Sequence, residues 1–326
     1  MPVKRIAVAE GAVADLSWIK PVAMRIGCEL VFGPVETLDQ LQSTTDGCEA
    51  LVVSLHKIGP EKMNALPKLV KCIGRLGIGL DNIDLVTAAK SRITVIYQPL
   101  YAIDEVANHA VAMIMALHRG LFTANEIVHN KNWGAATQVA EIVSLQDTTV
   151  GVIGCGRIGQ AVIRRLVPFT KHILGYDVLA PDNLDGVEMV SNLDDLLSRS
   201  HIVTLHAPYL PSTHHMIDEA QMARMPKGAI LVNVSRGGLI DEVALGMALE
   251  SGHLSGAGLD VFEIEPLPTN SHLRGIKNLI MSPHIAWYSQ SSGPRLAEWG
   301  LRDVLTFLTK QEIEYGSFAT GPFRTS

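Results

Sequence analysis

Short apolar runs alternate with helix-like segments along the first hundred residues. The apolar runs are KRIAVAE, CELVFG, ALVVS, LVKCIGR and ITVIY, and segments such as ADLSWIKPVAMRIG and GPEKMNALPK separate them. Runs that are apolar throughout, without a polar residue at every second position, are typical of parallel strands that helices cover on both faces. The pattern therefore predicts a small doubly wound sheet over roughly the first hundred residues.

A long apolar segment follows, from Ile103 to Leu121. Asp104 and Glu105 stand in its first turn and Arg119 in its last, as the helix dipole favours. Polar residues interrupt the segment and its length is marginal for a bilayer, so it does not indicate a membrane span. We predict a buried helix, either at the junction of two domains or at a dimer interface.

A second series of apolar runs begins at Thr148. It consists of TTVGVIG, HILGYDV, HIVTLHAP, GAILVNVS, LSGAGLDVF and NLIMSP, with a helix from about Arg157 and further helical segments between the runs. This series predicts a second doubly wound sheet. An amphipathic segment over Ser289 to Leu308 is expected to return to the first domain, and Ile313 to Phe318 to add a short strand or tail.

The chain is thus predicted to be an α/β protein with two doubly wound, Rossmann- or flavodoxin-like parallel-sheet domains. The first domain is discontinuous and comprises residues 1–100 plus 288–326. The second comprises residues 101–287, with hinges near Leu100 and Ala286. A chain of 326 residues exceeds what one hydrophobic core usually organises, which agrees with two domains.

Composition narrows the function. The net charge of −6 comes from interspersed acids and bases without a basic block, which argues against nucleic-acid or anionic-membrane partners. The four cysteines are scattered, without zinc-site spacing or a disulfide framework. No signal-peptide pattern stands at the N-terminus. We therefore expect a cytoplasmic protein without metal, nucleic-acid or membrane contacts.

A glycine-rich turn opens the second series. VGVIGCGRIGQAV places Gly154, Gly156 and Gly159 in a GxGxxG pattern between a strand and a helix. The first glycine permits a tight turn, the second a close approach of a pyrophosphate, and the third close packing of helix on strand. The amides of Arg157 and Ile158 would open the helix toward the anion. The pattern predicts a dinucleotide site.

The next strand ends with Asp177, eighteen residues beyond Gly159. A carboxylate there would accept hydrogen bonds from both ribose hydroxyls and repel a 2′-phosphate. Because Val178 and Leu179 bring no positive charge, NAD is favoured over NADP. The alternative is that Asp177 merely forms a turn before Pro181. With the whole unit in view, residues 101–287 are interpreted as an NAD-binding Rossmann domain.

Three further residues follow strands of the second series. Arg236 lies in VNVSRGGLID, Glu265 in LDVFEIEPLP and His284 in LIMSPHIAWYS. Reduction of a 2-keto acid needs a cation for the carboxylate and keto oxygen, and a proton donor supported by a carboxylate. Arg236 would be the cation, His284 the acid–base group and Glu265 its support. Singly, each has an ordinary explanation, and Glu263 is an alternative to Glu265.

At this point the sequence resembles the D-isomer-specific 2-hydroxyacid dehydrogenase family over nearly its whole length. NVSRGGLID, LDVFEIEP and PHIA match the family stretches that carry its arginine, glutamate and histidine. The resemblance implies that Arg236, Glu265 and His284 are catalytic, with NAD as cofactor and a small 2-keto or 2-hydroxy acid as substrate. It also implies a homodimer.

The resemblance assigns further binding residues. LGIGLDNID would form the substrate loop of residues 1–100 plus 288–326, the substrate-binding domain, with the amides of Leu76 and Gly77 on the substrate carboxylate. Asp260 would reach the nicotinamide carboxamide. The remaining residues expected along the cofactor are His206, Pro208, Thr213, Val234 and Ser235.

The sequence departs from the family pattern at YQPLYAID, which affects the expected hinge and helix cap. Arg75, His56 and AWYS resemble the branch that contains the C-terminal-binding-protein corepressors and their bacterial relatives. In that branch we expect Arg75 to assist the carboxylate and Trp287 with Tyr101 to form an apolar wall. The alternative is that Trp287 packs at the subunit interface.

Two other functions share these features. One is an NAD(H)-sensing scaffold, which the corepressor likeness suggests; the complete arginine, glutamate and histidine set argues against it. The other is oxidation of formate or phosphite. Formate dehydrogenases have glutamine where Glu265 stands, so the carboxylate disfavours formate, whereas phosphite stays open.

Overall fold

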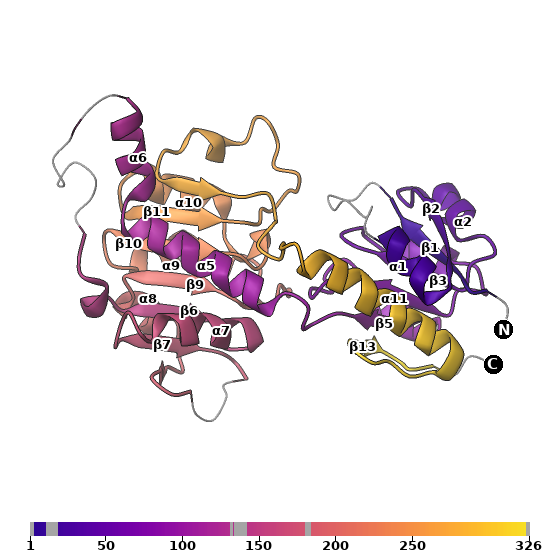
Figure 1. Cartoon of the computed structure of the whole chain (residues 1–326). Helices are drawn as coiled ribbons and strands as arrows, with labels where there is room; N and C mark the ends of the chain where they lie inside the picture. The colour runs from indigo at the N-terminus through magenta and orange to yellow at the C-terminus, as the bar shows by residue number, and fades with distance from the viewer. Residues whose placement is uncertain (1–2, 11–18, 131–132, 134–141, 180–183, 324–326) are drawn as a thin grey trace. The chain divides into compact units, whose positions relative to one another are not determined.

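The chain divides into two compact units in a computed structural model of the protein (Figure 1). The first unit comprises Met1–Ala102 with Tyr288–Ser326, and the second comprises Ile103–Trp287. The structure describes residues 3–10, 19–130, 133, 142–179 and 184–323. Residues 14–18 of the first expected helical segment, and Pro181, lie outside the described residues.

The first unit is built on a six-stranded sheet in the order β13-β5-β4-β3-β1-β2. Five strands are parallel, and β13 pairs antiparallel with β5. The strands are β1 (Arg5–Ala9), β2 (Glu29–Gly33), β3 (Ala50–Val53), β4 (Cys72–Arg75), β5 (Thr94–Tyr97) and β13 (Ser317–Thr320). The order of the parallel strands, 2-1-3-4-5, is that of flavodoxin-like folds.

Two layers of helices cover this sheet. One layer contains α1 (Ile19–Ile26) and α11 (Ser292–Lys310), and the other α2 (Leu38–Thr45), α3 (Pro60–Ala65) and α4 (Leu85–Lys90). Nearly every side chain of β1 and β3 is buried, as expected for strands covered on both faces. The return of the chain through α11 and β13 matches the prediction for the last segment.

The second unit has a seven-stranded parallel sheet in the order β12-β11-β10-β9-β6-β7-β8. Counted from β6 the order is 3-2-1-4-5-6-7, the dinucleotide-binding order extended by one strand. The strands are β6 (Val150–Ile153), β7 (Ile173–Tyr176), β8 (Glu188–Met189), β9 (Ile202–Leu205), β10 (Ala229–Asn233), β11 (Leu254–Leu259) and β12 (Leu279–Met281). The predicted fold class is confirmed.

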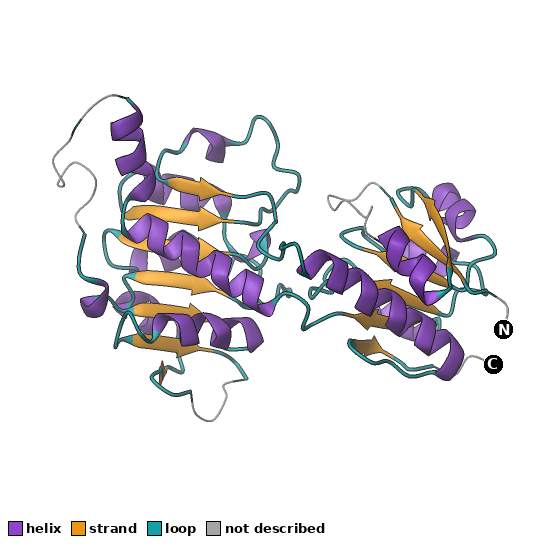
Figure 2. Cartoon of the chain, in the orientation of Figure 1, coloured by secondary structure: helices purple, strands orange, loops and turns teal. Residues whose placement is uncertain are grey.

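Helices lie on both faces of this sheet, in front of and behind the strands in Figure 2. One face carries α5 (Ile103–His118) and α7 (Arg157–Leu166). The other carries α8 (Leu193–Arg199), α9 (Glu219–Arg224) and α10 (Glu242–Glu250). Beyond these, the described residues of this unit form α6 (Leu121–His129) and the short 3₁₀ turns Leu145–Asp147, Gly237–Leu239 and His272–Gly275.

The helix expected over Ile103 to Leu121 is α5, which ends at His118. Gly120, with φ 57°, is the N-cap of the next helix, α6, and Leu121 is its first residue. α5 packs on α7 and on β10 and β11 of its own unit, which explains its apolar composition. Among the described residues, no helix is long and apolar enough to cross a membrane. All four cysteines are buried thiols without a disulfide bond.

Candidate active site

The three glycines of the GxGxxG turn have three different environments. Gly154 has φ 89°, and a Cβ there would lie 2.6 Å from the backbone nitrogen of Ala207. A Cβ on Gly159 would lie 2.0 Å from the carbonyl oxygen of Gly154, so only glycine lets α7 pack on this turn. A Cβ on Gly156, the N-cap of α7, would meet nothing within 4 Å. The space beside Gly156 is the cradle that a pyrophosphate requires, together with the amides of Arg157 and Ile158.

Asp177 follows β7 and folds back over the glycine turn. Its Oδ2 accepts a hydrogen bond from the backbone N–H of Cys155 at 2.7 Å, and its Oδ1 one from Leu179 at 2.8 Å. The carboxylate is therefore fixed beside the turn, next to the exposed side chains of Val178 and Leu179. Burial, with the charge of Asp177, raises the pKa of the Cys155 thiol to about 12, so this cysteine stays protonated.

The loop after β9 lies across from Gly154, where the strand order of the sheet reverses. Thr204 Oγ1 and His206 Nε2 are 3.0 Å apart, and burial lowers the pKa of His206 to about 3, so its ring is neutral. Within the described part of the chain, Nδ1 of His206 has no hydrogen-bond partner. The Thr213 hydroxyl donates to the carbonyl of Pro208 at 2.9 Å and thereby closes this loop.

Arg236 follows β10 in a loop that Asn233 shapes. The Asn233 amide donates to the carbonyl of Arg236 at 2.8 Å, and its oxygen accepts from the N–H of Ser235 at 3.0 Å. The Ser235 hydroxyl donates to the carbonyl of Leu205, and Val234 is buried beneath. Nη1 of Arg236 donates to the carbonyl of Ser235 at 2.7 Å. Asn233 stands in the N-x-x-R-G stretch but was not among the predicted site residues.

Glu265 and His284 form a close pair. Oε2 of Glu265 lies 2.6 Å from Nδ1 of His284, and Oε1 accepts from the N–H of Phe262 at 2.9 Å. Burial acts to raise the pKa of Glu265, but the hydrogen bond and charge of His284, the Phe262 N–H and the charge of Arg236 together lower it. The Glu265 carboxylate thus lies against Nδ1 of His284, on the side of the ring opposite Nε2.

The alternative acid, Glu263, has a different partner. Its Oε1 lies 3.0 Å from Nε2 of His215, and within the described residues it forms no hydrogen bond with His284. The geometry therefore favours Glu265 as the partner of His284.

Asp260 anchors the turn that carries His284. Its oxygens accept from the Ser282 hydroxyl at 2.5 Å and from the N–H groups of Ile285 and Ala286 at 2.9 and 2.8 Å. His109 of α5 lies 2.9 Å from the Ser282 hydroxyl. The turn gives His284 a φ of 55°, which only such anchoring sustains for a side chain of this size. In the structure Asp260, which was expected to reach the nicotinamide carboxamide, holds this turn with both oxygens.

Trp287 folds back on the same turn, where its indole N–H donates to the carbonyl of His284 at 2.9 Å. The structure thus gives Trp287 a local partner within the second unit.

The expected substrate loop lies in the first unit, directly after β4. The N–H of Leu76 donates to the carbonyl of Val53 at 2.8 Å, which continues the β3–β4 ladder. That donor is occupied, contrary to the expectation that it holds a carboxylate. Gly77 has φ 141°, and the buried Arg75 guanidinium occupies the space of its missing Cβ and donates to the carbonyl of Leu76.

Tyr101, also in this unit, is buried, and its carbonyl accepts from Arg295 at 2.7 Å.

The second unit thus brings Arg236, Glu265 and His284 to the carboxyl ends of three neighbouring strands, β10, β11 and β12, and places a dinucleotide cradle after β6. Among the described residues, no group of three or more His, Cys, Asp or Glu side chains could hold a metal ion. This fold and site define a nicotinamide-dinucleotide-dependent oxidoreductase.

Comparison with known proteins gives the particular family. The NAD-binding domain of the D-isomer specific 2-hydroxyacid dehydrogenases matches residues 111–286. The chain is 38% identical over 266 residues to a glyoxylate reductase of Korarchaeum cryptofilum, covering 80% of each protein. It is 38% identical over 259 residues to a D-3-phosphoglycerate dehydrogenase of Mycobacterium leprae, of which it covers 48%. The chain belongs to the D-isomer specific 2-hydroxyacid dehydrogenase family and binds a nicotinamide dinucleotide.

A solved structure supports this assignment. The crystal structure of the D-lactate dehydrogenase from Aquifex aeolicus, complexed with NAD and lactic acid, superposes with a TM-score of 0.84 at 29% identity. The alignment covers 98% of this chain and all of that one.

Proposed function

We propose that the protein reduces a 2-keto acid to the D-2-hydroxy acid, and catalyses the reverse reaction, with NAD(H). The observation that carries the proposal is the 2.6 Å contact between Glu265 Oε2 and His284 Nδ1, on strand ends next to the loop of Arg236. NADH, when bound by the glycine turn, supplies the hydride that C2 of the keto acid accepts.

The protein's own residues then transfer the proton and stabilise the charge of the substrate. Glu265 accepts from Nδ1 and stabilises the protonated ring of His284, so Nε2 can donate a proton to the oxygen that becomes the hydroxyl. In the reverse direction the same nitrogen accepts it. The Arg236 guanidinium offers a planar fork of donors that suits the carboxylate and polarises the adjacent carbonyl.

Residues of the first unit are proposed to bind the substrate carboxylate. Gly77 supports this role because its N–H has no backbone acceptor among the described residues, and the Arg75 cation lies beside it. We retain Tyr101 and Trp287 as candidates for an apolar wall around the substrate side chain. Leu76 would shape this loop through its side chain and carbonyl.

The cofactor is proposed to be NAD in preference to NADP. Asp177 is held by two backbone N–H groups in a position to receive ribose hydroxyls, and the exposed residues after it, Val178 and Leu179, are apolar. Along the rest of the cofactor we propose His206, Pro208, Thr213, Val234 and Ser235.

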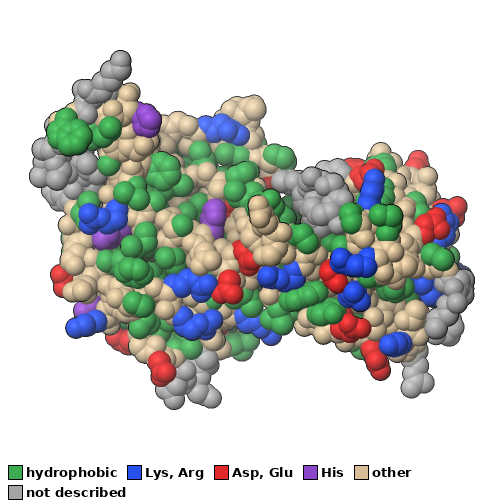
Figure 3. All heavy atoms as spheres, in the orientation of Figure 1, with side chains coloured by type: hydrophobic (Ala, Val, Ile, Leu, Met, Phe, Trp, Pro, Cys, Tyr) green, Lys and Arg blue, Asp and Glu red, His purple; other side chains and the backbone are tan. Residues whose placement is uncertain are grey.

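We further propose a homodimer in the cytoplasm, formed through α6. This helix has no buried residue, and Leu121, Phe122 and Val128 are each more than half exposed. Figure 3 shows hydrophobic side chains at the surface in the region of α6; over the rest of the face shown, hydrophobic side chains and charges of both signs are interspersed.

Turnover with purified protein tests the reaction. NADH, and separately NADPH, is mixed with keto acids from glyoxylate and pyruvate to phenylpyruvate, and the loss of nicotinamide absorbance is followed. We expect NADH oxidation with a D product, and its loss by at least about a thousandfold in His284→Ala while NADH binding persists. NADH binding without turnover of any keto acid in the wild type would contradict the proposal and favour an NAD(H) sensor.

A further inference from the structure

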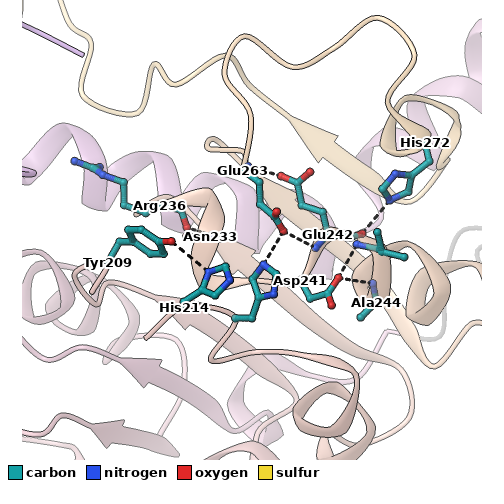
Figure 4. A network of polar contacts seen from close by, with 11 residues as sticks. Tyr209, His214, Asn233, Arg236, Asp241, Glu242, Ala244, Glu263 and His272 are labelled. Carbon is teal, nitrogen blue, oxygen red and sulfur yellow. Dashed lines mark hydrogen bonds and ion pairs between the residues drawn. The ribbon is translucent and has the colours of Figure 1, made fainter. Parts of the chain in front are cut away.

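Glu263 and Glu242 hold each other in a reciprocal arrangement beside the active-site loops (Figure 4). The backbone N–H of Glu263 donates to Oε1 of Glu242 at 2.7 Å, and the N–H of Glu242 donates to Oε1 of Glu263 at 3.3 Å. Glu242 is the first residue of α10, just after the Arg236 loop, and Glu263 precedes Glu265 by two residues. The two carboxylates therefore tie one catalytic loop to the other.

His215 adds a third connection. Its Nε2 lies 3.0 Å from Oε1 of Glu263, and its backbone N–H donates to the carbonyl of Gly238 at 2.8 Å, two residues beyond Arg236. His215 has φ 48°, an uncommon backbone conformation. Its ring points to the loop of Glu263 and its backbone N–H to the loop of Gly238. The ring stacks on His214 at a centroid distance of 3.9 Å, and His214 contacts the hydroxyl of Tyr209.

The two loops touch directly where these contacts hold them. A Cβ on Gly237 would lie 1.9 Å from the carbonyl carbon of Phe262, so the Arg236 loop and the Glu265 loop approach backbone to backbone. Phe262 is also the residue whose N–H binds Oε1 of Glu265. A shift of Glu263 would therefore move the donor that orients Glu265. Figure 4 shows the Arg236 side chain extending away from Glu242 and Glu263.

We propose that Glu263, held by Glu242 and His215, is a positioning residue. It keeps the loops of Glu265 and Arg236 in the relative positions that proton transfer at His284 requires. This inference rests on the proposed function. It assigns a role to the acid that the sequence offered as an alternative to Glu265. Burial, with the charge of Glu263, raises the pKa of Glu242, and the charge of His272, whose Nε2 lies 3.0 Å from the backbone carbonyl of Glu242, acts in the opposite direction.

The test compares Glu263→Ala with Glu263→Gln, whose Oε1 can still accept both hydrogen bonds. We expect Glu263→Ala to lower kcat for the keto acid by about tenfold to a hundredfold, because displacement of a catalytic group by about 1 Å has effects of that size. Its KM for NADH should stay within about twofold, and Glu263→Gln should recover most of kcat. Glu250→Ala, at the exposed far end of α10, is the matched control and should resemble the wild type.

The second readout is the pH dependence of the reduction rate. It would not change if Glu263 had only a structural role. A looser Glu265–His284 pair stabilises the protonated ring less, so the basic limb of the reduction rate should move to lower pH in Glu263→Ala and not in Glu263→Gln. The titration of the His284 ring, followed by NMR in the cofactor-free protein, should shift in the same direction. If Glu263→Ala does not fold, His215→Asn serves instead, since asparagine tolerates the positive φ but is too short to reach Glu263.

Outcomes separate the two proposals. Wild-type turnover, with kcat, pH profile and His284 titration unchanged in Glu263→Ala or His215→Asn, would overturn the positioning role and leave the proposed function intact. Absence of wild-type turnover would contradict the proposed function, while the His284 titration would still decide whether Glu263 positions the pair.

Discussion

Nδ1 of His284 lies 2.6 Å from Oε2 of Glu265, although the two residues follow different strands and are nineteen positions apart. The contact assigns the two ring nitrogens different tasks. Nδ1 is occupied by a carboxylate whose pKa is lowered, so in the proposed reaction Nε2 is the nitrogen that meets the substrate. The predictions below follow from this pair and from the parts of the second unit that hold it and the cofactor.

The acid stability of the protein should depend on Glu265. Its pKa in the folded state lies below the ordinary value of 4.5, so it contributes stability above that pH, which is lost as the pH falls through the lowered folded value. The difference in Tm between the wild type and Glu265→Gln should therefore narrow as the pH falls below about 4.5. Thermal unfolding between pH 4.5 and 3 measures this; a difference that widens over that range would contradict the assigned direction.

Two glycines of the cofactor turn should respond differently to alanine. Gly156→Ala meets no atom within 4 Å, so its free energy of unfolding should stay within about 0.5 kcal/mol of the wild type while its Kd for NADH rises at least about tenfold. Gly159→Ala places a methyl group against the carbonyl of Gly154 and should lose about 2 kcal/mol of stability. Urea unfolding and NADH fluorescence titration measure both. Equal stability loss in the two variants would argue against the cradle at Gly156.

Asp177 should decide between the two nicotinamide cofactors. Asp177→Asn removes the charge but keeps an oxygen that can accept from one backbone N–H, so the fold should persist. We expect the ratio of kcat/KM for NADH over NADPH to fall by at least about tenfold, because the repulsion of the 2′-phosphate is lost. Glu188→Gln on β8, an exposed acid paired with Arg199, is the control and should leave the ratio unchanged.

Asp260 should support catalysis through the turn that it anchors. Asp260→Ala leaves the Ser282 hydroxyl and two backbone N–H groups without their acceptor, which should cost about 3 kcal/mol of stability. The positive φ of His284 would then lose its support, so kcat should fall more than the affinity for NADH. Denaturant unfolding and steady-state kinetics test this. A variant with wild-type stability but weaker NADH binding would instead favour direct contact with the nicotinamide.

The helix α6 should carry the dimer contact. Leu121 and Val128 are seven positions apart and so lie on one face of the helix, beside Phe122. A Phe122→Lys, Val128→Lys double variant should be monomeric by light scattering, while the wild type is dimeric. Val243→Lys, which changes an exposed valine on α10, is the matched control. A wild type that is itself monomeric would contradict the proposal.

The sequence by itself determined the two doubly wound sheets, the cofactor turn and the positions of Arg236, Glu265 and His284. These features are local: continuous apolar runs identify parallel strands, three glycines at fixed spacing identify the turn, and a residue directly after a parallel strand lies at the carboxyl edge of the sheet. The return of α11 and β13 to the first unit was also predictable, because an amphipathic pattern needs a sheet to cover.

Only the tertiary structure decided which groups meet. Sequence spacing could not choose between Glu263 and Glu265, because both follow β11; the turn at Phe262 directs Glu265 to His284 and Glu263 to His215. Nor could it show that the N–H of Leu76 is occupied or that Asp260 holds the turn of His284. Each of these contacts joins segments distant in sequence, and its partner is fixed by strand order and backbone direction, which no local pattern encodes.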